Sequence, residues 1–363
     1  SKDYLRGEKG FDAAAVHAPG FYEDQQIELR SSTLVTGLDP AASTVTLASG
    51  ERIGYDRLLL ATGAVPRRLD VPGADLAGVR TLRTVDDADS LHQALDTSAR
   101  LVVIGAGWIG AEVAACARQL GADVAMVELA SVPLERVLGP EVGRIYRDLH
   151  AAHGVELHFG VGVEAIVGSE AVEAVRLSDG TVLPASTVVV GVGVSPRVEL
   201  AESAGLDVDN GVVVNAHLET SAPGIFAAGD VASAFHPRYG TRIRLEHWSA
   251  ALNQGPAAAR AMLGREVAYD RIPYFFSDQY DLGMEYRGWA PSFDEVVFRG
   301  DPESGQFLCF WLRDGVVAAA MNANVWDVGD TLAHLVRVGP ALDPAALADP
   351  DADLVGLAGP ESS

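Results

Sequence analysis

The sequence has few cysteines and no long apolar run. Cys116 and Cys309 are the only cysteines among 363 residues, they lie far apart, and no C-x-x-C pair occurs. Structural disulfides and a cysteine redox pair are therefore not expected, and Cys116 is predicted to be a packing residue. A cytoplasmic location is the corresponding prediction. Because no apolar run approaches the roughly 20 residues of a membrane span, no transmembrane segment is predicted.

Basic residues are also scarce. The sequence has 27 Lys and Arg against 50 Asp and Glu, which gives a net charge of −23. This balance argues against nucleic acids and anionic membrane surfaces as partners. No metal site is predicted, because the histidines show no ligand spacing; those considered are His17, His153, His158 and His217. The length and the 48% hydrophobic content predict a globular protein of two or three domains.

One stretch, residues 101–128, has the pattern strand, glycine turn, helix, strand. Leu101–Ile104 is a short apolar run typical of a strand that is buried on both faces. Gly105, Gly107 and Gly110 then fit G-x-G-x-x-G. The first glycine permits the tight turn, the second lets a pyrophosphate approach the backbone, and the third allows close helix packing. The start of the helix offers free N–H groups to phosphates, so a dinucleotide site is predicted here.

Glu128 ends the second strand of this unit, about 20 residues past the glycines, where a carboxylate can bind ribose hydroxyls. The next residues, Leu129, Ala130 and Ser131, include no Arg for a 2′-phosphate. We therefore expect NADH rather than NADPH. Arg136 leaves NADPH open, because a loop could bring it back to this position.

The surrounding sequence predicts an interrupted domain order. Residues 69–195 read as a complete nucleotide-binding domain, with a helix at 80–98 that begins at Thr84 and a final buried strand at 188–194. The pattern of the first segment resumes after residue 195, and aromatics crowd the chain from about 270. The last dozen residues read as a frayed tail. The predicted division is 1–68, 69–195, 196–269 and 270–363, the last being a separate α+β domain.

Five motifs occur in a fixed order. They are ATGAVPR at 61–67, VIGAGWIGAE at 103–112, VVVGVGVSPR at 188–197, IFAAGDVA at 225–232 and RLEHWSAALNQG at 244–255. This set resembles the FAD-dependent NADH:ferredoxin reductases of Rieske dioxygenase and cytochrome P450 systems, together with rubredoxin reductases. The resemblance covers nearly the whole chain.

The resemblance implies an α/β fold with two Rossmann-like, three-layer ββα nucleotide-binding domains of the pyridine nucleotide-disulfide oxidoreductase type and a C-terminal α+β domain. Segments 1–68 and 196–269 would form the FAD domain around the NAD domain. The implied reaction passes hydride from NADH to FAD and then single electrons to a ferredoxin-type [2Fe-2S] protein that feeds an oxygenase. A monomer or homodimer is expected. The missing C-x-x-C argues against the disulfide reductases that share the fold.

One departure concerns the start of the sequence. The family opens with a β-α-β unit that holds the ADP half of FAD, followed by Pro-Leu-Ser-Lys-x-Tyr-Leu, and this sequence begins at that Ser. We expect that first unit to lie outside this sequence. The chain as written is then expected to bind FAD weakly or not at all, whereas the intact protein binds it tightly.

The resemblance also implies the site residues. Lys2 and Glu112 are expected to pair beside the flavin as catalytic residues. The other residues expected to bind FAD are Val35, Ala61, Thr62, Gly63, Arg67, Arg83, Gly229, Asp230, Val231, Glu246, His247 and Trp248. NADH is expected at Gly105, Gly107, Trp108, Ile109, Gly110, Glu128 and Gly193.

Each main assignment has a structural alternative. Asp230 is expected to accept from a ribityl hydroxyl, but an Asx turn has the same pattern. Lys2 could be a solvated terminal lysine, and Trp248 a core residue rather than one that faces the partner. Four arginines could mark where an acidic ferredoxin docks, or could be ordinary surface residues; they are Arg67, Arg68, Arg242 and Arg244.

Two alternative functions stay open. One is an NADH-dependent flavoprotein with another acceptor, such as rubredoxin or oxygen. The other is a flavin-less NAD-binding protein, which would apply if the first β-α-β unit were truly absent.

Overall fold

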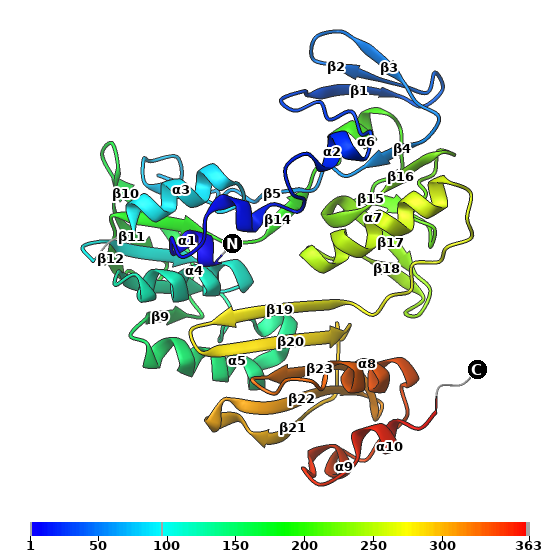
Figure 1. Ribbon diagram of the computed structural model, residues 1–363. Helices are drawn as coiled ribbons and strands as arrows, with labels where there is room; N and C mark the ends of the chain where they lie inside the picture. The colour runs from blue at the N-terminus through cyan, green and yellow to red at the C-terminus, as the bar shows by residue number, and fades with distance from the viewer. Residues whose placement is uncertain (1, 96, 361–363) are drawn as a thin grey trace. The chain divides into compact units, whose positions relative to one another are not determined.

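The computed structural model describes residues 2–95 and 97–360 (Figure 1). The chain forms two compact units. Unit 1 comprises Ser1–Ala14, Pro66–Gly193 and Phe275–Ser363, and unit 2 comprises Ala15–Val65 and Val194–Tyr274. The chain thus leaves the first unit and returns to it, and the four-segment division into domains stays a prediction.

The centre of unit 1 is a five-stranded parallel sheet with the order β6-β13-β7-β8-β9. Its central strands are apolar because both faces are covered, and Val102 and Val103 are 1% and 0% exposed. The strands are β6 (Val79–Arg80), β7 (Arg100–Ile104), β8 (Asp123–Glu128), β9 (Glu156–Phe159) and β13 (Thr187–Val190), and the helices between them are α3 (Val85–Ala94), α4 (Trp108–Gln119) and α5 (Glu135–Ala152). Small residues of α4, among them Ala111 and Ala114, are fully buried, so this helix packs closely on the sheet.

Thr84 caps α3, as predicted. Its hydroxyl accepts from the Asp87 amide at 3.2 Å, and the Asp87 carboxylate accepts from the Thr84 amide at 2.9 Å. This reciprocal capping box satisfies two amides that the helix cannot pair internally. The helix is shorter than the predicted 80–98.

The predicted single strand at 188–194 is wrong. Strand β13 ends at Val190, and β14 (Val194–Pro196) pairs with β5 (Ala64–Pro66) in a separate two-stranded sheet. The reason is Gly193, whose φ of 97° turns the backbone between the two pieces. An unbroken apolar run thus hides a turn.

The remaining part of unit 1 has two antiparallel regions. A three-stranded sheet consists of β10 (Val163–Gly168), β11 (Val172–Leu177) and β12 (Val182–Pro184), and a five-stranded sheet has the order β19-β20-β23-β22-β21. The strands of the latter are β19 (Tyr274–Gln279), β20 (Leu282–Gly288), β21 (Glu295–Asp301), β22 (Gln306–Arg313) and β23 (Val316–Ala323). Its core includes Trp311, whose indole N–H donates to the Leu138 carbonyl of α5 at 2.9 Å. This sheet therefore packs directly on the nucleotide-binding part of unit 1.

Three helices complete the C-terminal part: α8 (Gly329–Val338), α9 (Pro344–Ala348) and α10 (Leu354–Ala358) (Figure 1). The predicted frayed tail is wrong for α10. The Asp353 carboxylate caps this helix by accepting from the Val355 amide at 3.1 Å, and Leu354 and Ala358 are buried. Residues 361–363 of the predicted tail lie outside the described residues.

Besides the pair β5-β14, the described part of unit 2 contains three small sheets. These are β1-β2-β3, the parallel pair β4-β16, and β15-β17-β18. Their bounds are β1 (Val35–Asp39), β2 (Thr44–Leu47), β3 (Arg52–Gly54), β4 (Leu58–Leu60), β15 (Val212–Val214), β16 (Ile225–Ala227), β17 (Ala232–His236) and β18 (Thr241–Ile243). The helices are α2 (Phe21–Asp24), α6 (Glu199–Ser203), η2 (Gly229–Val231) and α7 (Trp248–Met262). Because β4 and β16 run parallel, the segments after them leave the same edge of their sheet.

The described residues contain neither a membrane-spanning helix nor a cluster of metal ligands. No helix among residues 2–95 and 97–360 is long and apolar enough to cross a membrane. In the same part of the chain, no group of three or more His, Cys, Asp or Glu side chains could hold a metal ion.

Candidate functional site

The glycine turn between β7 and α4 leaves room for a ligand at one position only. A Cβ on Gly105 would lie 2.5 Å from the Gly191 carbonyl oxygen, and a Cβ on Gly110 would lie 1.9 Å from the Gly105 carbonyl oxygen. Gly107, which caps α4, has no such neighbour within 4 Å. Two glycines are thus required by the fold, and the third faces open space beside the free amides of the first helical turn. These residues fit a dinucleotide pyrophosphate.

Glu128 lies beside this turn, as predicted. Its Oε2 accepts from the Ala106 amide at 2.8 Å, and its Oε1 accepts from the Ala130 amide at 3.1 Å. The carboxylate is only partly buried and retains lone pairs for a ribose hydroxyl. Arg136 is exposed on α5, and the described residues include no ion pair between it and Glu128. This arrangement suits NADH.

Three residues predicted to bind the coenzyme differ in which of their atoms a ligand can reach. The Trp108 ring packs on Phe275 at 4.9 Å and Tyr146 at 6.3 Å between centroids, so its side chain belongs to a core cluster. Only its backbone amide is available to a phosphate. Ile109 is 41% exposed at the helix surface, and Gly193 is exposed as well.

The predicted pair of Lys2 and Glu112 is present within unit 1. The Lys2 Nζ lies 3.1 Å from Glu112 Oε1, and the two side chains are 16% and 20% exposed. Lys2 comes from α1 (Lys2–Leu5), and Glu112 from the second turn of α4. The ammonium also lies 3.7 Å from Asp278 Oδ2 and 5.4 Å from the centre of the Phe276 ring. Lys2 is therefore not a solvated terminal lysine.

A pocket of about 370 Å³ lies next to this pair, with mostly apolar walls. Its lining includes Lys2, Glu112, Arg83, Ile109 and Cys116. An apolar cavity with two cations, Lys2 and Arg83, and one carboxylate suits a large planar ring that carries polar atoms. Cys116 is 1% exposed, and its burial raises the pKa of the thiol, which agrees with the predicted packing role.

Apart from Arg67 and Arg83, which belong to unit 1, the other residues expected to bind FAD lie in unit 2. Ala61, Thr62 and Gly63 follow β4, and Gly229–Val231 follow β16, so the parallel pairing brings the two segments to one edge. The Thr62 hydroxyl donates to the Arg197 carbonyl at 2.8 Å. Val35 is partly buried on β1, and Val231 is fully buried, which leaves only its backbone for a ligand.

The start of α7 lies within the same unit. Trp248 is 63% exposed, which excludes the core alternative and agrees with a surface that faces a partner. Burial lowers the pKa of His247 to about 4, so this imidazole is neutral at pH 7. The docking role of the four arginines stays a prediction, and Arg244 offers the least surface for it. Its side chain is 8% exposed and pairs with Glu246 at 2.6 Å, whereas Arg67, Arg68 and Arg242 are exposed.

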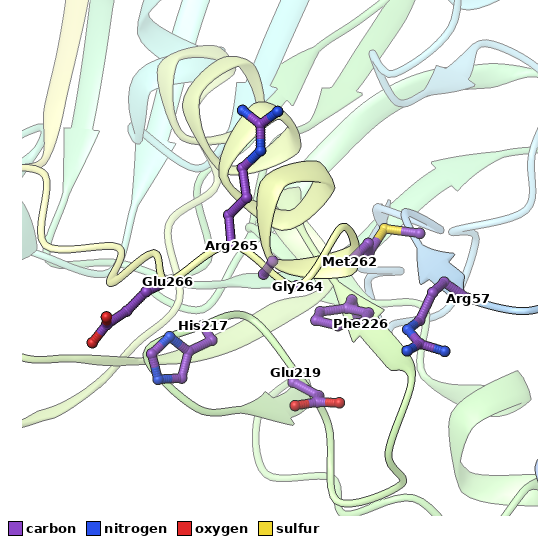
Figure 2. A pocket seen from close by; sticks show the side chains of 9 residues that line it. Arg57, His217, Glu219, Phe226, Met262, Gly264, Arg265 and Glu266 are labelled. Carbon is purple, nitrogen blue, oxygen red and sulfur yellow. The ribbon is translucent and has the colours of Figure 1, made fainter.

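A second pocket, of about 320 Å³, lies elsewhere in unit 2 (Figure 2). Arg57, Phe226 and Glu219 line it, and the Arg265 side chain is directed away from them. Glu219 is already occupied, because its Oε1 accepts from the Gly224 amide at 2.8 Å. None of the residues expected to bind a cofactor lines this pocket.

Comparison with known protein families gives two matches along the chain. Residues 4–255 match the model described as pyridine nucleotide-disulphide oxidoreductase. The chain belongs to this family. Residues 274–358 match the model described as reductase C-terminal, so this family member also carries the C-terminal domain expected from its aromatic strands. The predicted fold class is therefore confirmed.

Known relatives and solved structures indicate which branch of the family is most similar to this chain. The chain is 39% identical over 361 residues to a 5,5′-dehydrodivanillate O-demethylase ferredoxin reductase subunit of a Sphingobium species, covering 98% of this chain and 87% of the relative. It is 38% identical to putidaredoxin reductase of Pseudomonas putida, covering 89% and 78%. The ferredoxin reductase of the CYP199A2 system from Rhodopseudomonas palustris has a TM-score of 0.93 at 37% identity, covering 98% of this chain and 88% of that structure. The resemblance to ferredoxin reductases of oxygenase systems is thus confirmed.

Sequence reasoning missed three polar residues of these sites. Asp278 is the second carboxylate near Lys2, and Ser277 donates to Glu112 at 2.8 Å. Gln254 is 2% exposed, and its carbonyl accepts from the Gly229 amide at 2.8 Å, which holds the turn that carries Asp230. Gln254 lies within the RLEHWSAALNQG motif and could have been singled out there. Ser277 and Asp278 gave no signal, because the sequence does not reveal which face of their strand packs on α4.

Proposed function

We propose that this chain is the NADH-dependent, FAD-containing reductase that supplies electrons to a ferredoxin-type [2Fe-2S] protein feeding an oxygenase. The observation that carries the proposal is that one helix, α4, holds both parts of the reaction site. Gly107 starts this helix, and Glu112 follows five residues later with Lys2 as its partner. At 1.5 Å per residue, Gly107 and Glu112 lie about 7.5 Å apart along the helix.

Each residue has a definite task in this reaction. The glycine turn and Glu128 bind the pyrophosphate and the ribose of NADH, and the exposed Ile109 borders the space next to Glu112. Lys2 provides positive charge next to the apolar pocket, and Glu112 holds that charge in place. FAD, when bound, supplies the two-electron to one-electron chemistry, so the chain itself needs no acid, base or nucleophile. The protein contributes binding, orientation and electrostatics.

The proposal also covers the protein partner, the cellular location and the oligomeric state. Within unit 2, the exposed Trp248 and Arg242 are candidates for docking an acidic ferredoxin. The exposed Arg67 and Arg68 are separate candidates in unit 1. The protein acts in the cytoplasm as a monomer or homodimer. The domain scheme is that of an FAD domain split around an NAD domain, with the C-terminal domain last.

The test is the rate of NADH oxidation by the protein carrying FAD, with three acceptors supplied separately. Reduction of a [2Fe-2S] ferredoxin much faster than rubredoxin or oxygen is expected. Faster reduction of rubredoxin or oxygen would replace the ferredoxin by that acceptor. NADH binding without any oxidation in the presence of FAD would overturn the reductase assignment.

A further inference from the structure

Polar side chains of the C-terminal sheet reach the Glu112 carboxylate through the interior of unit 1. Ser277 Oγ lies 2.8 Å from Glu112 Oε1, and Gln279 Nε2 lies 3.2 Å from Ser277 Oγ. Ser277 and Gln279 are two positions apart on β19, so their side chains lie on the same face of the strand. Both side chains face inward and are 1% and 0% exposed. Polar groups at such positions are costly unless each has a hydrogen-bond partner.

The contacts continue from Gln279 to helix α5. His150, which is fully buried, has its Nε2 2.9 Å from Gln279 Oε1 and its Nδ1 3.2 Å from the Tyr280 hydroxyl. The Tyr280 ring stacks on His153 with 3.6 Å between centroids. A continuous line of hydrogen bonds therefore runs from Tyr280 to Glu112.

The Glu112 carboxylate at one end of this line determines which group donates in every hydrogen bond. A carboxylate only accepts, so the single Ser277 O–H donates to Glu112, and the Ser277 oxygen accepts from the Gln279 amide N–H. The Gln279 carbonyl then accepts from His150 Nε2–H, and the bare Nδ1 accepts from Tyr280.

The ionisation states of the two outer groups agree with this direction. Burial lowers the pKa of His150 to about 4 and raises the pKa of Tyr280, so at pH 7 the imidazole is neutral and the phenol keeps its proton.

We propose that this line is a positioning device for the Lys2–Glu112 pair, and that Ser277 is the residue through which the C-terminal domain fixes the Glu112 carboxylate. The inference rests on the proposed function, because the work of Glu112 is part of it. Other charged or titratable groups around the pair are Asp278, Cys116 and Tyr146, and Arg83 and Tyr4 line the same pocket. Asp278 is an alternative acceptor for Lys2 at 3.7 Å, so a loosened Glu112 would let the ammonium shift away.

The first test needs no cofactor and uses ¹⁵N NMR of histidine-labelled protein, with His150→Gln to assign the signal. His150 is expected as the neutral tautomer with its proton on Nε2 at pH 7. In the isosteric variant Gln279→Glu, a carboxylate replaces the amide, and His150 is expected to become doubly protonated at pH 7. A role limited to packing would not change the charge of the imidazole in this way. A proton on Nδ1 in the unmodified protein would overturn the proposed direction.

The second test measures the rate at which NADH reduces the protein carrying FAD. Ser277→Ala and Gln279→Glu are each expected to slow this step about tenfold. The first variant removes the donor to Glu112, and the second removes the Gln279 N–H that donates to the Ser277 oxygen and orients its hydroxyl. Ser233→Ala is the matched control, since Ser233 is a 5% exposed strand serine of unit 2 that lies outside the line. Reduction by Ser277→Ala at the unmodified rate would overturn the positioning role.

The two tests separate the inference from the proposed function. If NADH fails to reduce the unmodified protein carrying FAD, the proposed function is wrong, while the NMR result still decides whether the hydrogen-bond line exists.

Discussion

Gly110→Ala places a Cβ 1.9 Å from the Gly105 carbonyl oxygen, whereas real Cβ contacts stay beyond 3.0 Å. Helix α4 must therefore move by roughly 1 Å from a rigid turn, and overpacking of this kind costs about 3 kcal/mol. For 363 residues at about 2.1 cal/mol/K each, that corresponds to a fall in Tm of about 4 °C. Gly107→Ala meets no atom within 4 Å at an ordinary φ of −75°, so its Tm is expected to stay unchanged.

The same two variants should differ in coenzyme binding. A methyl group at position 107 fills the space reserved for the pyrophosphate, so Gly107→Ala is expected to weaken NADH binding at least tenfold, or about 1.4 kcal/mol. Thermal unfolding and NADH titration measure the two effects, with Gly10→Ala as the control, because Gly10 also has open surroundings. The reasoning is refuted if Gly107→Ala binds NADH like the unmodified protein, or if Gly110→Ala keeps its Tm.

Three further predictions concern single side chains. Glu128→Gln is expected to lower kcat/KM for NADH about tenfold and to narrow the preference over NADPH, because the carboxylate accepts from two backbone amides and from ribose; an unchanged ratio of the two coenzymes would contradict this. The pKa of His150 is lowered from 6.5 to about 4, so the unfolded state binds more protons between these values, and about 3 kcal/mol of stability is lost as pH falls from 6.5 to 4; denaturant unfolding should show a flatter pH dependence for His150→Gln. Trp311→Phe removes the donor to the Leu138 carbonyl and is expected to cost about 2 kcal/mol in the free energy of unfolding, with a loss below 0.5 kcal/mol arguing that water replaces the indole.

Local signals in the sequence predicted the local structure well. The capping box at Thr84 and the strand–turn–helix at residues 101–119 depend on neighbours within a few positions, and both occur as expected. The split of residues 188–194 into two strands could not be read from an apolar run, because a glycine at positive φ decides it. Helix α10 was missed because Leu354 and Ala358 are buried where this helix packs on α8, which the local sequence does not show.

The site residues were predicted partly from spacing in the sequence and partly from family resemblance. The glycine turn and Glu128 follow from spacing alone, whereas the pairing of Lys2 with Glu112, 110 positions apart, was expected only through family resemblance. The roles of Ser277 and Gln279 depend on which face of β19 turns inward, which their alternation with Phe276 and Asp278 does not reveal.

The most direct measurement is the visible absorption spectrum of the protein carrying FAD, recorded without oxygen before and after an equimolar amount of NADH. The account predicts that the flavin bands bleach with NADH and return when oxidised ferredoxin is added. Flavin bands that persist with NADH bound would contradict the central claim that this chain passes electrons from NADH through FAD to an iron–sulfur partner.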